Sequence, residues 1–245
     1  MAGARFESLF ARDLPHGRCV GVALPEGEAL SVEIPAAALA ALHEVERRHV
    51  ETLPPARRAG WVGGRIALRA ALADVGFQSG PILSTARGAP QLPAGARGSI
   101  SHKKGLVVAL AARAHADRGG GAAGAEVSTW HIGIDLERIV PGHSGIARYV
   151  LRADERARLP PGDDPRRLEE LLFAFSAKEA IYKALDPFLA RYVSFQEVAV
   201  ERRDAGEATA TLHLKTSEAF AVDVRWLRYD DFIVTTARVE AAARI

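Results

Sequence analysis

Cysteine is almost absent from this chain of 245 residues, and its scarcity excludes several kinds of site. Because Cys19 is the only cysteine, no disulfide can form within the chain, and no zinc site can be built from cysteine pairs. We expect this lone thiol to be partly buried and inert rather than catalytic.

Long apolar runs are also missing. No stretch approaches the roughly 20 apolar residues that a membrane-spanning helix needs, and the first residues contain no sustained apolar segment of the secretory type. Hydrophobic residues make up 48% of the chain and charged residues 25%, which is typical of a soluble globular protein. We therefore expect a cytoplasmic protein with no membrane partner.

Lysine is scarce, and its distribution is uneven. Only five of the 32 basic residues are lysines, and four of them are Lys103, Lys104, Lys178 and Lys183. Some of these positions are therefore expected to need a compact ammonium rather than a guanidinium. The formal net charge is only +2 and no basic, aromatic platform is visible, so the composition does not indicate a nucleic-acid partner.

Strand and helix patterns occur in both halves of the chain, which indicates a mixed α and β architecture. In the first half they predict strands at 18–24, 29–34 and 106–112, and helices at 36–50 and 56–75. In the second half they predict helices at 152–159 and 168–185, the latter stopped by the Asp-Pro pair at 186–187, and strands at 129–137, 194–201, 208–214, 220–227 and 232–237. The glycine-rich segment 118–124 is the best linker candidate, so we predict two lobes, residues 1–124 and 125–245.

Two acidic residues, Asp135 and Glu137, lie two positions apart on the predicted strand 129–137, so both side chains leave the same face. Two carboxylates placed in this way repel each other unless a cation lies between them. The same pattern would also fit a strand that ends at the surface with two solvated acids. Carboxylate oxygens are the ligands that Mg²⁺ prefers, which makes both residues candidate metal ligands.

A second set of charges lies on the predicted helix 168–185. Glu179 and Lys183 are four positions apart and share one face, flanked by bulky apolar residues. An ordinary amphipathic helix with one Glu–Lys pair would give the same pattern. If the helix meets the strand, Glu179 joins Asp135 and Glu137 as a third oxygen ligand, with the ammonium of Lys183 beside them.

Candidate phosphate-binding residues lie in the first half. Ser101 and His102 follow a Gly/Pro-rich loop at 88–93 and precede a buried strand, and at such a junction His102 could hydrogen-bond a phosphate. A lone histidine is more often structural. Arg65 and Arg69 form either a solvated helix face or a phosphate clamp. No Walker A sequence and no Gly-x-Gly-x-x-Gly is present, so a nucleotide phosphate would need another cradle.

Five segments, taken in order, resemble the 4′-phosphopantetheinyl transferase superfamily, specifically its two-lobed Sfp-type branch and the members similar to enterobactin synthase component D. These segments are Gly-Arg-Ile-Ala-Leu-Arg at 64–69, Gly-Ala-Pro at 88–90, Ser-Ile-Ser-His at 99–102, Gly-Ile-Asp-Leu-Glu at 133–137 and Phe-Ser-Ala-Lys-Glu-Ala-Ile-Tyr-Lys at 175–183. The tail after about residue 190 carries little of this resemblance.

The resemblance implies an α+β fold of two similar α/β lobes related by pseudo-twofold symmetry. It implies an enzyme that transfers the phosphopantetheine arm of coenzyme A to a serine of an apo acyl or peptidyl carrier protein and releases 3′,5′-ADP. It further implies a monomer, because two lobes are present in one chain. The carrier could serve fatty-acid, polyketide, nonribosomal-peptide or siderophore synthesis, and the sequence does not distinguish these.

The resemblance also implies roles for individual residues. Asp135, Glu137 and Glu179 would bind Mg²⁺, Glu179 or a water that it orients would accept the serine proton, and Lys183 would stabilise phosphate oxygens. The positions that it assigns to coenzyme A are Arg58, Arg65, Gly88, Pro90, Ser101, His102 and Lys183.

Two other hypotheses stay open. One is a Mg²⁺-dependent phosphotransferase that uses a nucleotide and needs no pocket for a 3′-phosphate. The other is a catalytically silent module that binds coenzyme A or carrier proteins. The complete set of acidic residues and Lys183 argues against a silent module.

Overall fold

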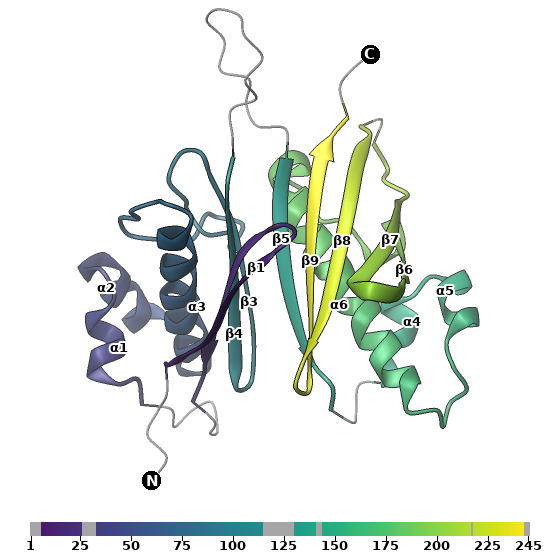
Figure 1. The fold of residues 1–245 in the computed structure, drawn as a ribbon, viewed down its shortest axis with the longest axis horizontal. Coiled ribbons are helices and arrows are strands. Elements are labelled where there is room, and N and C mark those ends of the chain that lie inside the picture. Colours follow the sequence, from purple (N-terminus) through teal and green to yellow (C-terminus); the bar gives the residue numbers. More distant parts are fainter. Residues whose placement is uncertain (1–5, 26–32, 115–129, 141–143, 217, 243–245) are drawn as a thin grey trace, which may run out of the picture. The chain divides into compact units, whose positions relative to one another are not determined.

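Helices pack on antiparallel sheets in both parts of the chain (Figure 1), as the predicted α+β class requires. The computed structural model describes residues 6–25, 33–114, 130–140, 144–216 and 218–242. The chain divides into two units, Met1–His115 and Ala116–Ile245. The predicted linker at 118–124 and the predicted boundary after residue 124 lie outside the described residues.

The first unit contains a four-stranded sheet in the order β1-β2-β4-β3, with all neighbours antiparallel. Its strands are β1 (Ser8–Leu14), β2 (Gly17–Ala23), β3 (Ala96–Lys103) and β4 (Leu106–Arg113). Of the strand predicted at 29–34, residues 29–32 lie outside the described residues, and residues 33 and 34 form no strand. The strand predicted at 18–24 is β2, which pairs with β1 on one edge and with β4 on the other. β1 was missed because its mostly exposed side chains give no apolar alternation.

The helices of the first unit are α1 (Ala36–Ala40), α2 (Glu44–Thr52) and α3 (Pro55–Asp74). The single helix predicted over 36–50 is split, because the carboxylate of Glu46 accepts the backbone N–H of His43 and starts a new helix there. α3 confirms the prediction for 56–75 and buries Leu68 and Leu72 against the sheet. Small residues let it approach β3 closely: a Cβ at Gly64 would lie 3.0 Å from Ile100.

The second unit contains a five-stranded antiparallel sheet in the order β5-β9-β8-β7-β6. Its strands are β5 (Trp130–Arg138), β6 (Val198–Arg202), β7 (Glu207–Leu212), β8 (Phe220–Tyr229) and β9 (Phe232–Ala241). All five predicted strands are present. The predicted strand 194–201 begins instead with a 3-10 turn, Phe195–Glu197, in front of β6.

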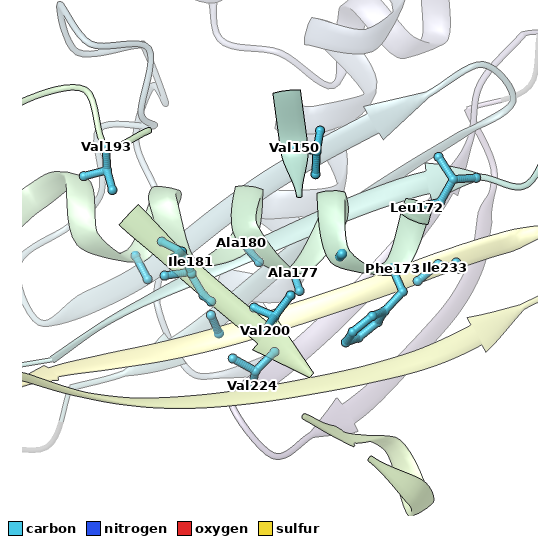
Figure 2. Close-up of a cluster of buried hydrophobic side chains, with 14 of the residues drawn as sticks. Val150, Leu172, Phe173, Ala177, Ala180, Ile181, Val193, Val200, Val224 and Ile233 are labelled. Atoms are coloured by element: carbon cyan, nitrogen blue, oxygen red, sulfur yellow. The ribbon is translucent and has the colours of Figure 1, made fainter. Parts of the chain in front are cut away.

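The helices of the second unit are α4 (Ala147–Val150), α5 (Ala153–Arg158) and α6 (Arg166–Leu189). In the core of this unit, Phe173, Ala177 and Ile181 of α6 gather with Val200 and Val224 of the sheet (Figure 2). Within the described part of the chain, no helix is both long and apolar enough to cross a membrane.

α6 does not stop at the Asp-Pro pair at 186–187 as predicted. Pro187 lies inside its last turn, where the missing N–H removes a single helical hydrogen bond. The helix ends at Leu189 and is capped by Ala190, which has a left-handed backbone (φ 47°) and donates its N–H to the carbonyl of Asp186.

A close backbone contact fixes α6 on β5. A Cβ atom at Gly133 would collide with the carbonyl oxygen of Ala180 and would lie 3.1 Å from the backbone nitrogen of Ala184. Since both obstacles are backbone, no side-chain rotation could make room. Side chains alternate between the two faces of a strand, so Asp135 and Glu137 leave β5 on the same face as Gly133. This is the face that meets α6.

We expect Gly133→Ala to force α6 away from β5 and to lower the free energy of unfolding by about 3 kcal/mol, the upper range for overpacking a core. Gly162→Ala is the matched control, because nothing lies within 4 Å of a Cβ atom at Gly162. Thermal unfolding of both variants measures the effect. Equal melting temperatures for the two would contradict the close contact.

Three buried glutamates join the starts of helical segments to remote parts of the same unit. Glu46, Glu155 and Glu197 each accept the N–H of the residue three positions earlier, as in a capping box. Each also accepts a remote backbone N–H, from Ile82, Val200 and Lys215 respectively. Each is paired with a cation: Arg69, Lys178 and Arg191.

Glu197 is expected to make the stability of the fold depend on pH. The hydrogen bond from Arg191, assisted by the N–H groups of Ser194 and Lys215, lowers the pKa of Glu197 from 4.5 to about 2. A carboxyl whose pKa is lower in the folded state stabilises the fold above its unfolded pKa, and the contribution is lost as pH falls toward 2.

Glu197→Gln should therefore be less stable than the parent near neutral pH, but should lose less stability between pH 4.5 and 2. Denaturant unfolding of both proteins over this pH range tests the prediction. Parallel stability curves would show that Glu197 carries no such linkage.

Candidate active site

The charged core of the site lies where α6 crosses β5. The ammonium of Lys183 donates to Asp135 Oδ1 at 2.8 Å and to the carbonyl of Ile134 at 2.9 Å. The Asp135 side chain is 7% exposed and that of Lys183 27% exposed, so this ion pair is shielded on one side and open on the other. The structure therefore brings together the two residues from separate segments that sequence reasoning had placed in one site.

The opposite strand supports this pair. Asp135 is in register with Thr235 of β9, whose hydroxyl lies 2.8 Å from the hydroxyl of Ser176 on α6. Both hydroxyls are buried, so this contact ties α6 to the sheet beside Asp135. Neither Ser176 nor Thr235 had been singled out, since an isolated hydroxyl residue leaves no recognisable pattern.

The two remaining acids lie next to the ion pair in sequence and on the same elements. Glu137 is 3% exposed and follows Asp135 on the same face of β5, and Glu179 lies half-buried one turn before Lys183 on α6. Within the described ranges, no three His, Cys, Asp or Glu side chains are grouped so that they could hold a metal ion. The assignment of Asp135, Glu137 and Glu179 to a metal thus stays a prediction.

Lys178, the other lysine of α6, has a structural role. Its ammonium is fully buried and donates to Glu155 Oε2 at 2.6 Å, to the carbonyl of Val150 at 2.8 Å and to that of Phe195 at 3.1 Å. Burial lowers the pKa of Lys178, and the hydrogen bond that its ammonium donates to Glu155 opposes that shift. This lysine joins α6 to two other segments, so the two lysines of the motif have different roles.

We expect Lys178→Met to leave Glu155 buried without its cation and to cost about 3–5 kcal/mol of unfolding free energy. In a unit of this size such a loss lowers the melting temperature by about 10 °C or more. Lys215→Met is the control, because that side chain is exposed. If the two variants melt together in a thermal scan, Lys178 is not a structural hub.

In the first unit, the guanidinium of Arg65 is bound by other residues of the same unit. Its Nε donates to the carbonyl of Ile82 and its Nη2 to the hydroxyl of Ser84, both at 2.8 Å, and its guanidinium stacks on Trp61. The residue is 5% exposed, and burial lowers the pKa of Arg65 to about 10. The alternative of a solvated helix face is therefore wrong for Arg65.

Gly88 and Pro90 lie on a short hairpin-like turn that this arginine holds. Ser84 and Pro90 form an isolated antiparallel β-bridge. The N–H of Thr85 donates to the carbonyl of Ala89, and the N–H of Gly88 donates to the carbonyl of Thr85. Gly88 has a φ of 86° with open space around the position of a Cβ, so the turn, rather than crowding, requires glycine there. The structure brings Arg65 together with the turn that carries Gly88 and Pro90.

The other predicted phosphate contacts diverge. Arg58 donates to the carbonyls of Leu53 and Glu51 at the end of α2, which is a helix-capping role. Ser101 and His102 lie on β3 rather than at a loop–strand junction, so their side chains leave opposite faces. Ser101 is buried, whereas the exposed His102 ring lies against α3 at Gly60, where a Cβ would collide with it.

One further residue, Glu46, escaped sequence reasoning. Glu46 had a detectable signal, since a glutamate three positions after a helix-starting residue forms a capping box. Its second role, the pairing with Arg69 and Ile82, joins segments too far apart for any local pattern. Cys19 is buried more completely than expected, at 1% exposed, and this burial raises the pKa of its thiol to about 12, which disfavours the reactive thiolate.

Comparison with known proteins decides the family. A model described as the 4′-phosphopantetheinyl transferase N-terminal domain matches residues 45–112, and the model of the 4′-phosphopantetheinyl transferase superfamily matches residues 131–237. The 4′-phosphopantetheinyl transferase Npt of Nocardia iowensis is 31% identical over 207 residues, covering 79% of this chain and 87% of that protein. The chain belongs to the 4′-phosphopantetheinyl transferase superfamily.

Another relative of similar identity agrees with this assignment. Enterobactin synthase component D of Salmonella typhimurium is 31% identical over 196 residues, which cover 77% of this transferase and 74% of that protein. The crystal structure of a holo-[acyl-carrier-protein] synthase from Thermotoga maritima matches 45% of this transferase and 63% of that chain, with 26% identity and a TM-score of 0.38. The predicted resemblance and the enzyme class, a 4′-phosphopantetheinyl transferase, are confirmed.

Proposed function

We propose that this transferase, acting as a monomer, moves the 4′-phosphopantetheine arm of coenzyme A to a serine of an apo acyl or peptidyl carrier protein. In this reaction the serine oxygen attacks the phosphorus that carries the pantetheine arm, and the bond to the bridging pyrophosphate oxygen breaks. The products are the holo carrier protein and 3′,5′-ADP. The observation that carries the proposal is the shielded Asp135–Lys183 pair, with Glu137 and Glu179 on the same two elements.

The three carboxylates have the ligand chemistry that a divalent cation requires. Asp135 and Glu137 are buried and Glu179 is half-buried, and all three carry the hard carboxylate oxygens that a compact divalent cation prefers. Asp135, Glu137 and Glu179 would hold Mg²⁺, although Lys183 already supplies one positive charge at Asp135. When bound, the metal would neutralise the pyrophosphate and the charge that develops on the leaving phosphate.

The chain's own residues supply the proton transfer and further charge stabilisation. Glu179, directly or through a water, takes the proton of the attacking serine as a general base. Lys183 is 27% exposed and donates two of its three N–H groups to Ile134 and Asp135, which leaves one N–H for a phosphate oxygen. Arg65, His102 and the turn with Gly88 and Pro90 would bind the phosphates and the adenine end of coenzyme A.

Intact-protein mass spectrometry tests this function. The purified transferase is incubated with coenzyme A, Mg²⁺ and a panel of apo carrier proteins, and a mass gain of one phosphopantetheine group is expected on at least one carrier. EDTA, or alanine in place of the carrier's serine, should abolish the gain. Glu179→Gln and Asp135→Asn should lower the rate by at least about 100-fold, whereas the exposed Asp163→Asn should not change it.

The outcomes separate the hypotheses. Coenzyme A binding without transfer to any carrier would favour a silent binding module. Binding of a nucleoside triphosphate but not of coenzyme A would favour a different phosphotransferase. Near-normal rates for Glu179→Gln or Asp135→Asn would overturn the roles assigned to these acids.

A further inference from the structure

We propose that Glu46 is a positioning residue for the coenzyme A site. Its carboxylate fixes the peptide of Ile82, and through that peptide it sets the turn that carries Gly88 and Pro90. The inference rests on the proposed function, because it assigns a purpose to the turn that coenzyme A would contact.

The carboxylate of Glu46 is completely buried and fully used. Oε1 accepts the N–H of Ile82 at 2.7 Å and Nη2 of Arg69 at 3.0 Å. Oε2 accepts the N–H of His43 at 2.8 Å and the same nitrogen of Arg69 at 2.7 Å. One side chain on α2 therefore holds the start of its own helix, a guanidinium of α3 and a loop residue that lies 36 positions later in the sequence.

The backbone of Ile82 is hydrogen-bonded at both its N–H and its carbonyl. Glu46 accepts its N–H, while Arg65 donates to its carbonyl and to the hydroxyl of the nearby Ser84. Ile82 itself is 1% exposed, so its side chain anchors the same point in the core. Because Ile82 is held at its N–H, its carbonyl and its side chain, its position relative to α3 is fixed.

The turn beyond Ile82 moves as one piece with it. Its internal backbone bonds join Thr85 to Ala89, Gly88 to Thr85, and Gln91 to Leu83, and the side chain of Gln91 donates to the carbonyl of Ser84. With these bonds in place, a displacement at Ile82 is carried to Gly88 and Pro90 rather than absorbed between them. The position of Ile82 thus sets the position of the whole turn.

Charge explains why a carboxylate is needed there. Arg65 and Arg69 lie one turn apart on α3, and Glu46 supplies the negative charge between them. Without that charge the two guanidinium groups repel each other, and Arg65 loses the alignment with which it holds Ile82 and Ser84. The remaining net positive charge suits a phosphate-bearing ligand.

Glu46→Gln is the direct test. A glutamine replaces one carboxylate oxygen by an NH₂ group, which then faces two donors in either orientation of the amide. We expect the dissociation constants of coenzyme A and of 3′,5′-ADP, measured by calorimetry, to rise by the same factor of about ten or more. The KM for coenzyme A should rise in parallel, with kcat at saturating coenzyme A unchanged, because every hydrogen bond of Glu46 described above stays within Met1–His115.

Glu197→Gln is the matched control. Glu197 is also buried, accepts the N–H of its own cap and a remote backbone N–H, and pairs with an arginine, but none of these hydrogen bonds involves a residue of the turn. A merely structural role predicts that both variants lose stability and neither changes the dissociation constants. If Glu46→Gln is too unstable to purify, Glu46→Asp keeps the charge with a shorter reach and should weaken binding in the same direction.

The outcomes are distinct. Binding weakened by Glu46→Gln or Glu46→Asp but not by Glu197→Gln supports the inference. Unchanged binding in a folded Glu46 variant, or a fall in kcat without a rise in KM, overturns it. A parent protein that binds neither coenzyme A nor 3′,5′-ADP overturns the proposed function itself, and with it the assignment of the turn.

Discussion

A buried carboxylate that accepts hydrogen bonds from several separate segments is the interaction on which this structure depends. Glu46, Glu155 and Glu197 are each almost completely removed from solvent, a placement that is costly unless donors and a cation surround the charge. Here every one of them begins a helical turn, receives a distant backbone N–H and meets an arginine or a lysine. Long connections in both units are thereby held in place without disulfides.

The second constraint is the contact of α6 with β5, which places the reactive charges. Gly133 allows the backbone of the helix to rest on the strand, so Lys183 reaches Asp135 two residues further along. The hydroxyl pair of Ser176 and Thr235 supports the same crossing on the neighbouring strand. A site built on a helix and a strand that touch through backbone atoms is held more rigidly than one built on loops.

Much of this could be predicted from the sequence, because periodic and motif-like patterns carry the information. The helices at α3 and α6 and the strands of the second unit follow from apolar periodicity, and the pairing of Asp135 with Lys183 follows from their motifs. β1 escaped because its side chains are mostly exposed, and Ser101 and His102 separate because a strand sends neighbouring residues to opposite faces. The clamp of Glu46 and Arg65 on Ile82 could not be predicted, since it depends on three segments meeting in space.

The glycine contact also has an evolutionary consequence. The separation of α6 from β5 is set by backbone atoms of Gly133 and Ala180 and not by the size of any packed side chain. Substitutions elsewhere on the apolar face of α6, at positions such as Phe173 or Ile181, can therefore change the strength of the core while the spacing of the charged residues is conserved. Sequence drift in the interior is decoupled from the chemistry, so relatives can diverge widely in their cores and still present the same arrangement of charges.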